Sequence, residues 1–324
     1  MASDLEVFGT EVNRKESNPL APQEERCTSK QDERKLSSSY CQWGCFPNGI
    51  YQATSITKKT LPSDCYQLDT NNFGLMFISH PMKTDDLIKF NDEYSTKLLK
   101  EINSFWSLEK EFFNFGFLHK RGILLWGAQG SGKTSIVQLI IKDLIQNFDG
   151  IVLICNCSPS LVAESIKQIK QVEPKRKIIC LFEDIDAIIR RFGEAELLSL
   201  LDGETQVNNV LNIATTNYPE LLDKRIVSRP RRFDRRIRID MPSAEVREQY
   251  FVNKVGDKVD KKEIDTWVEA TDGFSFAALT ELVVLVKCLK NNFNDAIKDI
   301  RDLIDHKVSS DHYEKGQIGF GVKK

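Results

Sequence analysis

The chain has 324 residues, of which 41% are hydrophobic and 28% charged, a mixture that predicts a soluble globular protein long enough for two domains. A net charge of −2 provides no global field that would draw nucleic acid or an anionic membrane, so any such contact has to be local. Apolar runs of five to seven residues are too short for the ~20 that span a bilayer, and residues 1–20 lack the apolar core of a secretory signal. The eight scattered cysteines suit a reduced compartment, so we expect a cytoplasmic protein without a membrane partner (in the host cytoplasm if the chain is virus-encoded).

Residues 1 to about 60 are polar and predict a flexible N-terminal arm. Within this arm, the stretch CQWGCFPNG holds Cys41 and Cys45 and predicts a turn with an apolar anchor. The alternative is a metal site with Cys27 as third ligand, although no paired Cys or His set follows. The alternating residues of 61–83 predict a small β segment that could form a hairpin.

Residues 84–242 are expected to form a large α/β domain. Apolar residues recur at three- and four-residue steps through 84–113, which predicts helix and core packing. The apolar run GILLW at 122–126 predicts a strand, and the glycine-rich stretch GAQGSGKT at 127–134 follows it directly. Helical periodicity then continues from Ile136 to Ile145.

The glycine-rich stretch has the spacing of a phosphate-binding loop: Gly127, four residues, and then Gly132, Lys133 and Thr134. Glycines permit positive φ, so successive N–H groups turn into one concavity, and the start of the following helix adds free N–H groups and a positive dipole end. Lys133 provides charge for the β- and γ-phosphates, and the hydroxyl of Thr134 is a magnesium ligand. The predicted nucleotide-binding residues are Gly127, Gln129, Gly130, Ser131, Gly132, Lys133, Thr134 and Ser135.

Further apolar strands alternate with helical stretches, which predicts a parallel α/β sheet covered on both faces. These strands are expected at 150–155, 177–182, 210–215 and 236–241. Ligands of such sheets lie at the carboxyl ends of the strands. Glu183 and Asp184 directly follow the strand at 177–182, where they can approach a magnesium ion held at the phosphate loop. The predicted metal-site residues are Thr134, Glu183 and Asp184.

Four motifs together resemble the AAA+ ATPase superfamily, and within it the AAA subgroup. KRGILLWGAQGSGKT is similar to the family's strand and phosphate loop, and CLFEDIDAII to its Walker B segment. IATTNYPELLDKRIVSRPRRFDRRIRIDMP is similar to the second region of homology, and EATDGFSFAALTELV to a helix of the lid domain. The motifs occur in the family's order over about 115–305. The resemblance implies a P-loop large domain over 84–242 and a small α-helical lid domain over 243–308, with 309–324 left as a mobile tail.

The resemblance implies an enzyme that binds and hydrolyses ATP with Mg²⁺. Asn217 matches the asparagine that orients the attacking water or senses the γ-phosphate, and Arg229 and Arg232 match arginine fingers that act in a neighbouring subunit's site. A ring or helical homo-oligomer follows, most often a hexamer. The alternative for the arginines between 225 and 238 is a basic surface that contacts nucleic acid.

The acid pair departs from the family pattern. The usual order is Asp, which holds the metal's water shell, and then Glu, which polarises the attacking water. Here Glu183 precedes Asp184, an inversion that resembles the inner-membrane AAA translocase for folded Rieske protein, whose transmembrane segment is not seen in this sequence. Asp is one methylene shorter, so either Asp184 is the base through a shifted water, or Glu183 folds toward that water. We expect slow but real hydrolysis.

Three further departures occur. In SLVAES, 160–165, the smaller Leu161 stands where ring translocases carry an aromatic residue that grips polypeptide in the pore. Phe276 replaces the lid's usual glycine, and either fills the lid core, which we favour, or packs on the nucleotide base. Ala128 and Gln129 replace prolines of the phosphate loop.

Two functions remain open at the level of sequence. The first is an ATP-hydrolysing enzyme that remodels a protein partner, with a folded or bulky partner favoured over a threaded one. The second is a low-turnover, ATP-binding switch or loader that assembles on DNA or on a protein machine. The sequence favours the first, and DNA is the less expected partner.

Overall fold

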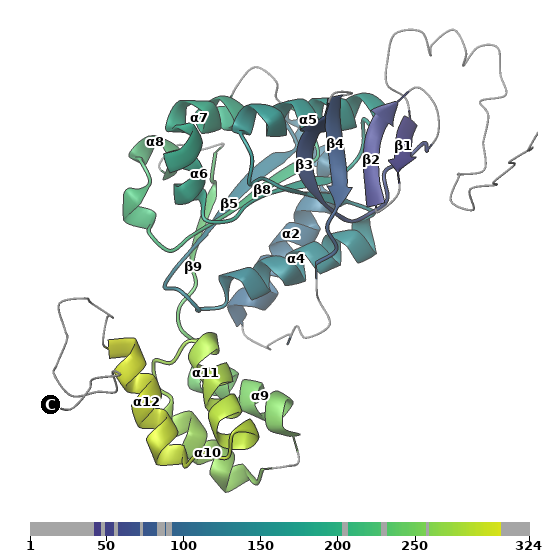
Figure 1. The fold of residues 1–324 in the computed structure, drawn as a ribbon. Helices are drawn as coiled ribbons and strands as arrows, with labels where there is room; N and C mark the ends of the chain where they lie inside the picture. The colour runs from purple at the N-terminus through teal and green to yellow at the C-terminus, as the bar shows by residue number, and fades with distance from the viewer. Residues whose placement is uncertain are drawn as a thin grey trace, which may run out of the picture.

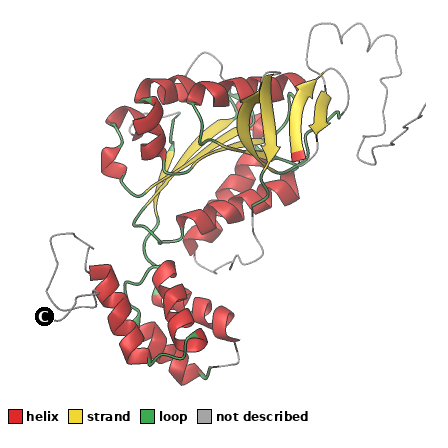
Figure 2. Ribbon diagram, viewed as in Figure 1, coloured by secondary structure: helices red, strands yellow, loops and turns green. Residues whose placement is uncertain are grey.

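The structure, a computed structural model, describes residues 42–46, 49–54, 58–71, 74–82, 88, 93–202, 207–227, 232–256 and 259–305. Within these residues a nine-stranded sheet with helices on both faces forms one domain, and a group of helices forms a second, smaller one (Figures 1 and 2). The predicted fold class, an α/β domain with an α-helical lid, is confirmed. The predicted C-terminal tail and residues 1–41 of the predicted arm lie outside the described residues.

The sheet has the strand order β1-β2-β4-β3-β6-β7-β8-β5-β9. Its strands are β1 (Gln42–Phe46), β2 (Ile50–Thr54), β3 (Cys65–Asn71), β4 (Gly74–Ser79), β5 (Lys120–Trp126), β6 (Ile151–Ile154), β7 (Ile178–Phe182), β8 (Val210–Thr216) and β9 (Arg235–Arg238). Every pairing from β3 through β6, β7, β8 and β5 to β9 is parallel, whereas β1, β2, β4 and β3 pair antiparallel. The parallel sheet predicted from the apolar runs is therefore present, with β5 to β9 as its strands.

The N-terminal strands differ from the predicted flexible arm. Residues 42–54 contain β1 and β2, and β2 pairs with β4 of the predicted hairpin. Trp43 is fully buried and packs edge-on against Phe77 with ring centroids 4.9 Å apart, which is the apolar anchor expected in this stretch. β3 pairs with β6, so the hairpin extends the main sheet rather than standing apart. Cys27 and Cys41 of the metal alternative lie outside the described residues.

Helices cover both faces of the sheet (Figure 1). One face carries α2 (Glu93–Ser107) and α4 (Lys133–Phe148), and the other carries α5 (Pro159–Val172), α6 (Ile185–Phe192) and α7 (Glu194–Asp202). The short elements α3 (Glu109–Asn114), η2 (Pro219–Leu221) and α8 (Lys224–Val227) lie in the connections. Helices on both faces bury both sides of each central strand, which explains the continuous apolar runs in the sequence.

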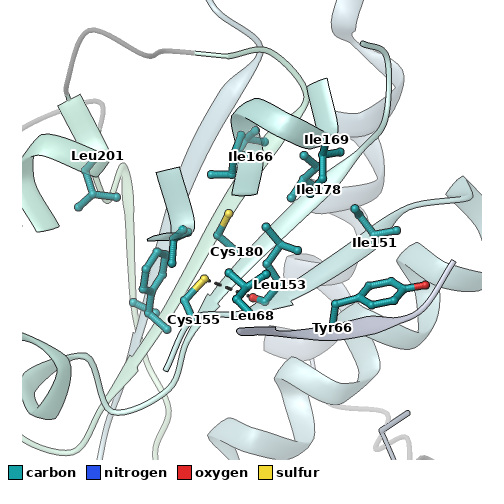
Figure 3. Close-up of a cluster of buried hydrophobic side chains, with 14 of the residues drawn as sticks. Tyr66, Leu68, Ile151, Leu153, Cys155, Ile166, Ile169, Ile178, Cys180 and Leu201 are labelled. Carbon is teal, nitrogen blue, oxygen red and sulfur yellow. Dashed lines mark hydrogen bonds between the residues drawn. The ribbon is translucent and has the colours of Figure 1, made fainter. Parts of the chain in front are cut away.

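Alternate residues of β7 illustrate this double burial. Ile178 and Cys180 join the core under α5, and Ile179 and Leu181 join the core under α4. Figure 3 shows part of the first core, where side chains of β3, β6, β7 and α5 meet. The labelled members are Tyr66, Leu68, Ile151, Leu153, Cys155, Ile166, Ile169, Ile178, Cys180 and Leu201. This packing fixes the carboxyl ends of the strands relative to one another.

The lid contains α9 (Ala244–Val255), α10 (Lys261–Ala270), α11 (Phe276–Val283) with a π-helical turn at Val284–Cys288, and α12 (Phe293–Asp305). Ser243 caps α9, since its hydroxyl accepts the N–H of Val246. Trp267 stacks on Phe293 at 5.7 Å and forms the centre of a separate lid core. Among the helices that the structure describes, none is both long and apolar enough to cross a membrane.

Candidate nucleotide-binding site

The phosphate loop runs from the end of β5 to the first residue of α4, as the glycine spacing predicts. Gly127, Gly130 and Gly132 all have positive φ, at 156°, 75° and 100°. A β-carbon on Gly127 would lie 2.1 Å from the carbonyl oxygen of Ile239, so only glycine fits beside the segment that leads into the lid. The backbone therefore follows a path that a glycine-poor sequence could not take.

Lys133 and Ser131 lie inside this loop. The Lys133 side chain is 7% exposed, and its Nζ donates to the carbonyl oxygens of Gly127 at 2.9 Å and Ala128 at 2.8 Å. Burial lowers the pKa of Lys133, and the charge of Asp184 opposes that shift. The Ser131 hydroxyl is buried without a hydrogen-bond partner among the described residues. A buried polar group of this kind is expected where a polar ligand completes the site.

The acid pair stands at the carboxyl end of β7. Asp184 adopts the left-handed conformation, with φ 48° and ψ 58°, which Asp and Asn tolerate better than other side chains. Its backbone N–H donates to Thr215 Oγ1 at 3.1 Å, which fixes that conformation. Burial raises the pKa of Glu183, and the neighbouring charge of Asp184 adds to the shift.

Asn217 joins the acid pair from the next strand. Its Nδ2 donates to Asp184 Oδ1 at 3.4 Å. One residue earlier, the Thr216 hydroxyl donates to Asp186 Oδ1 at 2.8 Å, so β8 is tied to the start of α6 twice. β8 pairs with β7 on one side and with β5 on the other. The phosphate loop, the acid pair and Asn217 therefore meet at one edge of the sheet.

A cavity of about 860 Å³ opens beside the loop, which is the size of a small-molecule site. Ser131 and Gly132 of the loop and Ser135 of α4 line part of it. Its wall includes apolar residues that we did not predict as site residues, namely Ile88, Leu98, Ile136, Leu139, Met241, Pro242 and Val246. They come from α2, α4, the segment between β9 and α9, and α9 itself, together with Ile88 ahead of α2. The apolar Met-Pro pair after β9 is the one local sign of this wall in the sequence.

The remaining predicted loop residues are less enclosed. Thr134 is exposed on the first turn of α4, next to Lys133. Gln129 is exposed and is not part of the cavity wall. The predicted role of Thr134 needs an open hydroxyl, and its position permits that role.

The predicted arginine fingers fall into two cases. Arg232 is 4% exposed, its Nε donates to Asp202 Oδ2 at 2.5 Å, and an Nη1 hydrogen bond joins it to the carbonyl oxygen of Arg225. Its guanidinium is thus committed inside its own chain, which differs from the open group that a trans finger presents. Arg229 lies outside the described residues, so its role stays a prediction.

The donor set fits a magnesium nucleotide. Positive φ at three glycines curls the loop, as in N–H cradles for phosphate, and Lys133 adds a cation. Thr134, Glu183 and Asp184 provide oxygen atoms, the ligands that Mg²⁺ prefers. The chemistry at this edge of the sheet is that of a P-loop nucleotide-binding ATPase with a helical lid.

Comparison with known proteins gives the family. Residues 123–241 match the ATPase family associated with various cellular activities (AAA). The matched segment begins in β5, contains the phosphate loop, the acid pair and Asn217, and ends after β9. Residues 123–241 of the chain are therefore a domain of the AAA+ ATPase superfamily.

Its curated relatives include ATP-dependent zinc metalloproteases. FtsH 1 of Conexibacter woesei is 30% identical over 206 residues, which cover 57% of this chain and 31% of the relative. FtsH 3 of Petrotoga mobilis is 30% identical over 65% of this chain and 37% of the relative. FtsH of Cyanidium caldarium is 27% identical over 72% of this chain and 42% of the relative. The chain thus spans less than half the length of these relatives, and their names describe those proteins.

Proposed function

We propose that the chain binds and hydrolyses Mg-ATP at this site and couples the reaction to remodelling of a protein partner. The observation that carries the proposal is the meeting of Lys133, Asp184 and Asn217 at the carboxyl ends of adjacent parallel strands. Lys133 would bind the β- and γ-phosphates, and Mg²⁺, held through Thr134 and the acid pair, would neutralise charge on the phosphates.

The contacts of the acid pair favour separate roles within that reaction. Asp184 is hydrogen-bonded to Asn217, so these two side chains together can hold and polarise a water molecule. Glu183 is then the residue that holds the metal's water shell. The left-handed backbone at 184 suits the shorter acid, which explains how the inverted order can still work.

Paired neutral substitutions test these roles. Asn tolerates the left-handed conformation as well as Asp does, so Asp184→Asn removes the charge without straining the backbone. We expect it to bind Mg-ATP normally and to hydrolyse it at least ~100-fold more slowly, the usual contribution of a general base. Glu183→Gln should instead weaken magnesium-dependent binding. Binding is measured by calorimetry and turnover by phosphate release.

The opposite pattern would reverse the assignment. If Glu183→Gln traps bound ATP while Asp184→Asn loses magnesium-dependent binding, Glu183 is the base. Asp184→Glu is the control for chain length, because it keeps the charge and places a longer acid in the left-handed conformation. Normal turnover in both neutral variants contradicts the proposed reaction.

A homo-oligomer, with a hexamer as the expected size, is part of the proposal. Arg229 remains the candidate for a trans arginine finger, since Arg232 is paired with Asp202. Several large apolar side chains between 108 and 118 are exposed, and a subunit contact would bury them. They are Leu108, Phe113, Phe115, Phe117 and Leu118, at 43% to 74% exposure.

Residues 160–165, which the resemblance compares with the pore segment of ring translocases, do not favour threading of a polypeptide. The predicted pore stretch, 160–165, is the first part of α5 and not a loop. Leu161 packs against the sheet core, and Val162 is fully buried. These side chains are therefore held in the fold rather than presented to a substrate, which supports a folded or bulky protein partner.

The second candidate function is a low-turnover switch or loader on DNA or on a protein machine. Arg235, Arg236 and Arg238 on the edge strand β9 are exposed and form a local group of cations, in which Arg235 pairs with Glu101 and Arg238 with Asp240. Turnover measurements separate the two functions. A ten-fold stimulation by a protein partner supports remodelling, and stimulation by DNA that falls steeply with added salt supports the loader.

A further inference from the structure

The first turn of α11 in the lid lies directly against the phosphate loop. The backbone N–H of Phe276 donates to the carbonyl oxygen of Gly130 at 3.0 Å. Ser275, which caps α11, also lies against Gly130, because a β-carbon on Gly130 would lie 2.9 Å from Ser275 Cβ. The lid is thus joined to the loop that is expected to hold the phosphates.

The ring of Phe276 covers the next glycine of the loop. A β-carbon on Gly132 would lie 3.1 Å from Cδ2 and 2.8 Å from Cε2 of this ring, and the second distance is shorter than real β-carbons show. The ring therefore lies in contact with Gly132. The ring of Tyr250 also lies near the Phe276 ring, with the two ring centroids 5.9 Å apart.

The position of this turn is supported from within the lid. The Thr280 hydroxyl donates to the carbonyl oxygen of Phe276 at 2.8 Å and lies 2.7 Å from the Tyr250 hydroxyl. Phe276 also packs against the apolar lid core, though it is only partly buried. Its ring is thus held between the lid and the loop. The contact with the lid core agrees with the role we favoured for Phe276, whereas the contact with the loop was not predicted.

The ring and the loop share the same cavity. Phe276, Ser131, Gly132 and Ser135 all line the space of about 860 Å³ beside the loop. A polyphosphate that binds the N–H groups at the start of α4 has to lie along the surface of Gly132 that faces this cavity. With the ring in contact with Gly132, that surface is covered.

We propose that Phe276 is autoinhibitory: its ring covers the phosphate loop and slows nucleotide binding. The inference rests on the proposed function, because it concerns how ATP reaches that site. Nucleotide binding requires the first turn of α11 to withdraw from Gly130 and Gly132, and Phe276 makes this withdrawal rate-limiting. The contact between the Phe276 ring and Gly132 couples the position of the lid to nucleotide binding, because the ring and the phosphates compete for the same surface of the loop.

The test compares binding rates of a fluorescent ATP analogue with Mg²⁺ by stopped flow. Phe276→Ala removes the ring and keeps the backbone N–H that bonds Gly130. We expect its association rate constant to rise about ten-fold or more, with tighter binding, because an aromatic contact of this size corresponds to at least one factor of ten. Phe276→Leu keeps apolar volume for the lid core and should fall between Ala and the wild type.

Phe293→Ala is the matched control, since it removes an aromatic ring that packs on Trp267 within the lid. It should leave the association rate near that of the wild type. Equal association rates for wild type, Phe276→Ala and Phe276→Leu overturn the proposed inhibition by Phe276 and leave the proposed function standing. Weaker binding of Phe276→Ala through faster dissociation also overturns it, because the ring would then hold the nucleotide. Failure of the wild type and all variants to bind overturns the proposed function as well.

Discussion

Lys170 lies on α5 with its ammonium group largely buried, and its Nζ donates to the carbonyl oxygen of Arg176 at 2.5 Å. Burial lowers its pKa to about 8, against about 10.4 for an unfolded lysine. Between these values the unfolded chain holds a proton that the folded chain has lost, so stability rises with pH there. The charged ammonium therefore costs stability below about pH 8, and this cost vanishes above the unfolded pKa.

Lys170→Met should remove this pH dependence. We expect the variant to gain free energy of unfolding relative to the wild type, by about 1–3 kcal/mol more at pH 7 than at pH 9.5. Urea unfolding at the two pH values measures the difference. Lys167→Met, at an exposed lysine of the same helix, is the control and should show no such change. A pH-independent difference for Lys170→Met contradicts the account.

At the scale of single residues, the sequence indicates which residues form a phosphate-loop motif, but it does not show which contacts their neighbours make. The spacing of Gly127, Gly132 and Lys133 predicts a phosphate loop because few other structures require it. The pairing of Arg232 with Asp202 could not be predicted, because the two residues lie on separate elements. The left-handed backbone at Asp184 depends on the hydrogen bond that its N–H donates to the Thr215 hydroxyl on the next strand, and the sequence does not show this contact.

At the scale of elements, the N-terminal strands are held by a buried polar network at the C-terminal end of α5, formed by its C-cap residue Glu173 and by Arg176 in the connection to β7. Trp43 Nε1 and the Leu61 N–H both donate to Glu173 Oε1 at 2.7 Å, and Arg176 pairs with the other carboxylate oxygen at 3.2 Å. Arg176 also donates to the Leu61 carbonyl oxygen at 2.6 Å. Composition alone predicted a flexible arm here, because the acid and the arginine that hold these strands stand over 100 residues later.

Glu173→Gln should therefore destabilise the protein far more than an exposed substitution. It removes the buried one of the two carboxylates that pair with Arg176, the other being the exposed Asp149. Breaking a buried pair typically costs about 3–5 kcal/mol. Glu164→Gln, at an exposed position of the preceding helix α5, should cost less than about 0.5 kcal/mol. Thermal and urea unfolding compare the two. Equal stability of the two variants would show that the network does not hold the strands.

The helices and strands after residue 120 were predicted closely, because strong periodicity and buried runs mark them. The α4 helix spans Lys133–Phe148 and contains the whole segment from Ile136 to Ile145 whose periodicity predicts a helix. The exception is 160–165, which the resemblance compares with a pore-lining segment and which forms the first part of α5 instead. Ser158 explains the difference, since its hydroxyl accepts the Leu161 N–H and caps the helix.

At the scale of the whole molecule, the exposed apolar residues between 108 and 118 predict self-association. Phe115→Ser with Phe117→Ser should lower the mass of the Mg-ATP-bound assembly, because these rings are 74% and 58% exposed in the isolated chain. Sedimentation velocity measures the mass. An unchanged assembly would place the subunit contact elsewhere, and a monomeric wild type would contradict the proposed homo-oligomer.

The central claim is that the loop around Lys133 binds the polyphosphate of a magnesium nucleotide. Calorimetric titration of Mg-ATP into the wild type and into Lys133→Ala tests it most directly, with circular dichroism to verify that the variant is folded. We expect saturable binding by the wild type and at least a ~100-fold loss of affinity in the variant, because its charged hydrogen bonds to the phosphates are gone. Equal affinity of the two folded proteins, or no binding by the wild type, would contradict the account.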